Sequence, residues 1–190
     1  MKKLILCWAT VACAVVFGDL KIATVNMVEL LSLHPTHESN KALVKSTGDD
    51  YKKKMDAKQD ALKELADEAK KVYEDMQNPM LSAAAKADLQ KKLEGIQQRG
   101  TAARQELLRA DQHFREELAD LETRLLRLET ADIRAKVSAY AKKNGYALIV
   151  DSTTAVWAAE NLDVTDAILK AMNVDPAKRK TLKEKTDESK

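Results

Sequence analysis

The side chains with the strongest chemical potential are two histidines near the start of the chain. His34 and His37 stand three positions apart and Glu38 follows directly, a combination that could contribute ligands to a zinc site. Such a site needs further ligands within reach, and the spacing supplies none. Pro35, between the histidines, favours a polar helix start at a proline bend instead. We therefore predict that this segment binds no metal.

A search for catalytic groups ends in the same way. Asp151 and Ser152 follow an apolar stretch, as a nucleophile would, but no glycine elbow or paired base accompanies them, so we predict a turn. The sequence also lacks a glycine-rich phosphate loop. Cys7 and Cys13 are the only cysteines, and both stand within the first 18 residues, so the rest of the chain has no thiol chemistry. These observations predict a protein that is not an enzyme and uses no cofactor.

Basic residues are numerous, but acids are mixed among them. The 32 Lys and Arg include Lys2 and Lys3, and the 30 that remain are balanced by 30 Asp and Glu. Alternating charge of this kind is typical of a solvated coiled-coil face, and we predict no nucleic-acid partner. The basic residues that could contact a nucleic acid are Lys91, Lys92, Arg99, Arg104, Arg109 and Arg115.

The elements around these residues are long helices. Charged residues make up 33% of the chain and aromatic residues 4%, a composition typical of solvated helices. Apolar residues recur at alternating steps of three and four, which is the period of a coiled-coil seam. The outgoing seam, with Lys58 in one position, contains Met55, Leu62, Leu65, Ala69, Val72 and Met76. The returning seam contains Leu89, Leu93, Ile96, Gly100, Ala103, Leu107, Ala110, Phe114 and, after one longer step, Leu118, Leu121, Leu125 and Leu128.

A single break separates the two helical segments at residues 78–82. Pro79 removes a backbone donor and restricts Asn78, while Ser82 can cap the helix that follows. The break therefore predicts the tip of an antiparallel helical hairpin over residues 37–143. Gly95 and Gly100 make the half of the hairpin near the tip the more pliable one.

The beginning of the chain has the pattern of a secretory signal peptide over residues 1–18. Lys2 and Lys3 precede an apolar run from Leu4 to Phe17, and Gly18 is the expected cleavage position. A second interpretation makes Cys13 the lipid acceptor of a lipoprotein, although apolar residues continue past it.

The two ends of the remaining chain predict a small β-rich body, formed by residues 19–36 and 144–173. Strands are expected at 20–27, at 146–150 and, more weakly, at 155–159, and Asp163 is expected to cap a short helix. Residues 174–190 are rich in lysine and predict a disordered tail. So few strands cannot build an independent core, and we expect the chain to associate with itself.

The sequence resembles the Skp/OmpH family of periplasmic chaperones. The resemblance depends on the strand motif Lys21–Met27, the hairpin with its proline-containing tip, the motif Tyr146–Asp151, and the helix start Asp163–Asp166. It implies an α+β fold that is mostly α, in which a long coiled-coil hairpin projects from a small β body. It further implies a homotrimer whose strands join in a barrel, with three arms around a cavity that holds unfolded outer-membrane proteins without ATP.

Several residues receive roles from this interpretation. Those expected to build the trimer body are Ile22, Val25, Leu148, Val150 and Trp157. Met80 and Leu81 at the tip are expected to contact clients, because methionine suits promiscuous apolar contacts. Membrane or lipopolysaccharide contact is left open, since no basic cluster offers a place for it. The alternatives are a structural coiled coil that tethers envelope components, and a periplasmic binder of nucleic acid or lipid whose affinity falls steeply with salt.

Overall fold

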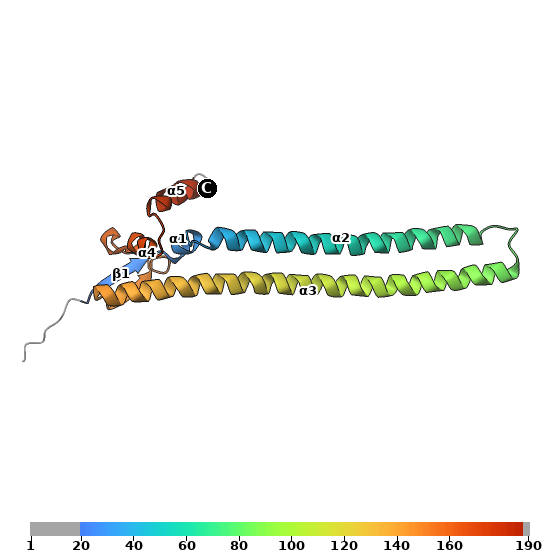
Figure 1. Cartoon of the computed structure of the whole chain (residues 1–190), viewed down its shortest axis with the longest axis horizontal. Coiled ribbons are helices and arrows are strands. Elements are labelled where there is room, and N and C mark those ends of the chain that lie inside the picture. Colours follow the sequence, from blue (N-terminus) through green and yellow to red (C-terminus); the bar gives the residue numbers. More distant parts are fainter. Residues whose placement is uncertain (1–19, 188–190) are drawn as a thin grey trace, which may run out of the picture. The chain divides into compact units, whose positions relative to one another are not determined.

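The computed structural model describes residues 20–187, most of which are helical (Figure 1). The expected signal peptide, its cleavage position and Cys13 lie outside these residues. None of the helices between residues 20 and 187 combines the length and the apolar character needed to span a bilayer. The elements in chain order are β1 (Ile22–Val25), α1 (Met27–Ser32), α2 (His37–Met76), α3 (Ala83–Asn144), β2 (Leu148–Asp151), the 3-10 helix η1 (Glu160–Leu162), α4 (Thr165–Ala171) and α5 (Ala177–Asp187).

The chain divides into two compact units. The hairpin unit comprises residues 34–132, and the body comprises the described residues of 20–33 and 133–187. Helix α3 contributes to both, because its last turns, from Ile133 on, belong to the body. The range predicted for the hairpin, residues 37–143, therefore includes the part of α3 that belongs to the body.

The hairpin unit consists of α2 and α3, which run side by side in opposite directions (Figure 1). The rings of Tyr51 and Phe114 stack with their centroids 4.5 Å apart. Nearer the tip, Arg99 donates a hydrogen bond of 2.9 Å to Glu68. The predicted antiparallel hairpin is therefore confirmed. Helix α2 is also continuous through Gly48, although glycine in a helix interior costs about 1 kcal/mol relative to alanine.

The predicted seam packs between the two helices with one correction. Val72 and Ile96 are buried, and Lys58 fills its seam position while its ammonium group contacts Glu106. Leu128, however, is 63% exposed, and Glu129 is only 3% exposed in its place. After the long step that precedes Leu118, the seam continues in steps of three and four, and a further four residues from Leu125 lead to Glu129. The prediction for Leu128 was wrong because it assumed a step of three residues after Leu125, whereas the helix buries the residue four positions after Leu125.

The tip is held by short-range hydrogen bonds. The Asn78 side chain accepts from the backbone N–H of Met80 at 3.0 Å. The Ser82 hydroxyl accepts from the N–H of Ala85 at 3.2 Å, which confirms Ser82 as the cap of α3. Two hydrogen bonds to side chains thus hold the turn, each between residues two or three positions apart.

The body contains a parallel two-stranded sheet in which Ile22 pairs with Leu148 and Val25 with Asp151. On its other side, Thr24 of β1 forms an isolated bridge with Asp163. The strand expected at 155–159 does not form, since that segment has no regular structure. The buried apolar core of the body consists of Ala23, Val25, Leu30, Ile133, Val164, Ile168, Leu169, Met172 and Val174.

Helix α3 ends at Asn144, directly before a glycine. Gly145 has φ +70°, a left-handed conformation that glycine adopts at little cost. The N–H of Tyr146 then reaches back to the carbonyl of Ala141 at 3.0 Å, which completes a Schellman-type end.

The structure corrects the prediction that residues 174–190 form a disordered tail. Val174 is buried in the core of the body, and residues from Ala177 to Asp187 form α5. Sequence composition pointed to disorder because α5 has almost no apolar residues. An arginine instead attaches this helix to the body, as described below.

Candidate functional site

The body exposes several large apolar side chains, two of them on its short sheet. Ile22 and Leu148 are register partners, and both are exposed. Trp157 is 81% exposed in the irregular segment after β2, next to the fully exposed Val156. Val150 is half-buried. Among the described residues, β2 pairs only with β1, so its second edge is open.

Four of the five residues predicted for assembly therefore keep exposed surface, and one does not. Val25 is 3% exposed and packs in the core of its own chain. The period-two pattern of the strand could not decide between these environments, because both faces of β1 carry aliphatic residues. Val25 therefore stabilises the apolar core of the body and is not available for contact with another copy.

A hollow of about 410 Å³ lies in the body between the strands and the end of α3. Its polar members include Asp151, whose carboxylate accepts from the N–H of Thr153 at 3.1 Å. The backbone of Ser152 donates to Val25 at 2.8 Å, so Asp151 and Ser152 form the turn that was predicted. The residues that line this hollow are Val25, Met27, Arg134, Val137, Ser138, Ala141, Ile149 and Asp151.

The histidines join the two helices of the hairpin unit. His34 Nε2 lies 3.3 Å from Asp132, and His37 Nδ1 lies 3.1 Å from Glu129. The amide of Asn40 donates to the second Glu129 oxygen at 2.7 Å. These contacts satisfy the carboxylate that replaces leucine in the seam. No group of three or more possible metal ligands is found within residues 20–187.

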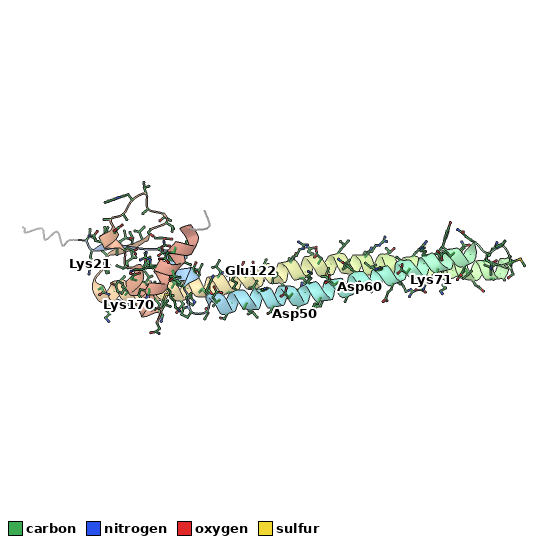
Figure 2. All side chains as sticks on the ribbon, turned by 90° about the horizontal axis from the view of Figure 1, so that it is seen from above. Lys21, Asp50, Asp60, Lys71, Glu122 and Lys170 are labelled. Carbon is green, nitrogen blue, oxygen red and sulfur yellow. The ribbon has the colours of Figure 1, made fainter. Side chains whose placement is uncertain are left out.

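Side chains project along the whole length of both hairpin helices, as Figure 2 shows with Asp50, Asp60 and Lys71 on α2 and Glu122 on α3. Both predicted contact residues at the tip, Met80 and Leu81, retain accessible surface, and Met80 is 89% exposed. A hollow of about 650 Å³ opens beside Leu81. It is lined by Glu74, Asp75, Asn78, Leu81, Ala85, Asp88 and Leu89.

Arg179 of α5 forms a cluster that the sequence did not reveal. Its guanidinium group donates to Glu29, to Asp163 at 2.6 Å and to Asp166 at 3.1 Å. Glu29 lies in the first turn of α1, and Asp163 and Asp166 lie at the start of α4. Acidic residues are common at helix starts, so the sequence offers no reason to expect a cluster. No sequence signal separates Arg179 from the lysines around it.

The charge states of this cluster support each other. Burial opposes the charge of Arg179, but hydrogen bonds with Asp163, Glu29 and Asp166 outweigh it and raise the pKa of the guanidinium group. For Asp163, burial acts to raise the pKa of the carboxyl group. The hydrogen bonds from Thr165 and Arg179 act in the opposite direction and are the larger effect, so the pKa is lowered overall. Both members of the Arg179–Asp163 ion pair are therefore charged at neutral pH.

Comparison with known proteins shows a family match that covers most of the chain. Residues 21–172 match the family described as outer membrane protein (OmpH-like). This range includes the hairpin unit and most of the body, and it ends before α5. A search of curated proteins gave no match.

Proposed function

Because the chain belongs to the OmpH-like family, which consists of periplasmic chaperones for outer-membrane proteins and not of enzymes, we propose that it is an ATP-independent holdase. It binds unfolded outer-membrane β-barrel proteins between the arms of a homotrimer and prevents their aggregation. The observation that carries the proposal is the match across hairpin and body together, since a charged coiled coil alone would be unspecific.

The hairpin supports a mechanism based on many weak contacts. Few of its side chains are completely buried, and its exposed surface mixes both charges with single apolar residues such as Leu108 on α3 and Met80 at the tip. Three such arms around one unfolded chain raise the effective concentration of every contact, so no single strong site is needed. The charged faces keep the bound chain solvated and allow its release without ATP.

The body supports self-association. Its open β2 edge is a template for further pairing, and exposed apolar residues of this size favour a protein interface. The exposure of Ile22, Leu148 and Trp157 supports their assignment to the surface that a second and third copy would cover in this proposal. A homotrimer would pair the open β2 edge and cover the exposed apolar residues in one assembly.

Sedimentation of the chain from residue 19 on, alone and after dilution of a urea-unfolded outer-membrane β-barrel into it without ATP, tests the proposal. A trimer that takes the β-barrel into one soluble complex is the expected result. A trimer that leaves the β-barrel to aggregate would support a tethering role instead. A monomer or dimer would contradict the proposed assembly.

A further inference from the structure

The hollow at the hairpin tip has a composition that suits a particular kind of side chain. Its apolar residues are Leu81, Ala85 and Leu89, all of which are partly buried. Carboxylates accompany them, namely Glu74 and Asp75 near the end of α2 and Asp88 near the start of α3. No lysine or arginine lines it. The hollow therefore combines an apolar surface with negative charge.

Few basic side chains of the protein pair with these acids. Glu74 has Lys70 at 4.0 Å in an exposed pair, but within residues 20–187 neither Asp75 nor Asp88 forms a salt bridge. Glu74 and Asp75 also stand in the last turn of α2, which contains no basic residue. A helix C-terminus carries partial negative charge, so acids there oppose the helix dipole. A cation placed in the hollow would relieve this repulsion.

The size of the hollow restricts what that cation can be. Its volume of about 650 Å³ is far larger than a single metal ion needs, and residues 20–187 contain no metal-ligand group. Sites of roughly 300–1,000 Å³ receive organic groups. Lysine and arginine combine an apolar stem with a charged end, which fits an apolar surface beside carboxylates.

We propose that the tip hollow binds lysine or arginine side chains of unfolded clients, together with an apolar neighbour in the client sequence. The aliphatic stem lies on Leu81, Ala85 and Leu89, and the cation pairs with Asp75 and Asp88. Met80, beside the hollow, adds an adaptable apolar contact to the neighbouring residue. This inference rests on the proposed holdase function and assigns a preference to it.

The test uses the full chain and two fluorescent peptides that differ in one group. Both have a lysine flanked by leucine and phenylalanine, and in one of them this lysine is acetylated, which keeps its stem and removes its charge. The wild-type protein should bind the charged peptide about fivefold more tightly, as expected for a partly exposed ion pair of about 1 kcal/mol. The variant Asp75→Asn/Asp88→Asn should bind both peptides equally.

A matched control is Asp56→Asn/Asp60→Asn, which neutralises two exposed acids of α2 away from the hollow and should keep the preference. The tip variant should fold normally, because removing an acid from a helix C-terminus does not weaken the helix. Equal binding of both peptides by wild-type protein, or an unchanged preference in the tip variant, would overturn the inference. So would salt-sensitive association of wild-type trimers that the tip variant lacks, because another copy would then occupy the hollow.

The same samples are tested for suppression of β-barrel aggregation. Suppression without any peptide preference would reject the tip inference alone. If the wild-type protein does not suppress aggregation of the β-barrel, the holdase function on which the inference rests would be rejected.

Discussion

Arg179 joins parts of the body that are distant in sequence, since its partner Glu29 is 150 positions away. The side chains of Arg179 and Glu29 are 13% and 12% exposed. Removing one member of a buried ion pair leaves the other charge without compensation. The cluster therefore makes α5 an integral part of the body.

We predict that Arg179→Met lowers the free energy of unfolding of the body by about 2–4 kcal/mol, because Glu29 and Asp163 lose their cation while the side-chain volume is kept. Thermal and urea unfolding would measure the loss. Lys180→Met is the matched control on the same helix. Since Lys180 is exposed, its change should stay within about 0.5 kcal/mol. Equal effects of the two substitutions would contradict the role of Arg179.

The lowered pKa of Asp163 gives the body a specific response to acid. A carboxyl group whose folded pKa lies below its unfolded value contributes its full stability above the unfolded value, near 3.8. That contribution is lost as the pH falls through the lower folded pKa. We predict that the body loses stability below about pH 4, and that Arg179→Met loses less over the same range. Urea unfolding at about pH 6 and pH 3 would measure the difference, and parallel losses in both proteins would exclude Asp163 as the cause.

At the scale of elements, the glycines inside α3 and the glycine that follows this helix should respond in opposite ways to substitution by alanine. A Cβ added at Gly95 or Gly100 would meet nothing within 4 Å, whereas Gly145 has φ +70°. We predict that Gly100→Ala stabilises the hairpin by about 1 kcal/mol, and that Gly145→Ala destabilises the end of α3 by about 1–2 kcal/mol. Circular-dichroism melts would show shifts of opposite sign. A shift of the same sign in both would contradict this assignment.

The elements also show how far the sequence could lead. The seam period and the proline tip predicted α2 and α3, because local packing and backbone chemistry decide them. The strand expected at 155–159 failed because pairing needs a partner strand, which the sequence pattern does not supply. Glu129 was missed for a similar reason, since its donors Asn40 and His37 come from the opposite helix.

At the scale of the whole molecule, the central prediction concerns assembly. Val150 lies on β2, whose second edge is open among the described residues. Val150→Asp should dissociate the proposed trimer, because a charge would be buried in the joined sheets without a partner. Light scattering after size-exclusion chromatography would give the mass. Leu108→Asp, at an exposed apolar position of the hairpin, should leave the trimer intact, and a trimer of unchanged mass in both variants would refute this placement.

Sequence predicted the division into hairpin and body, but not which surfaces are covered. The resemblance placed Val25 with the assembly residues, and the structure places it in the core of its own chain. The tip hollow arises only where the ends of α2 and α3 meet. Its acids and leucines look like ordinary solvated helix residues when the sequence is considered alone.

The parallel pairing of β1 with β2 has a consequence for the order in which the chain folds. The N–H of Met27 bonds to Asp151 over 124 positions, so the body cannot form until nearly all of the polypeptide is present. Contacts of such sequence separation form slowly when they must be found by diffusion. The hairpin shortens the search, since it can close from its tip through short-range steps and bring the two ends together. We therefore expect the hairpin to close from the turn at Asn78 to Ser82 before the body forms.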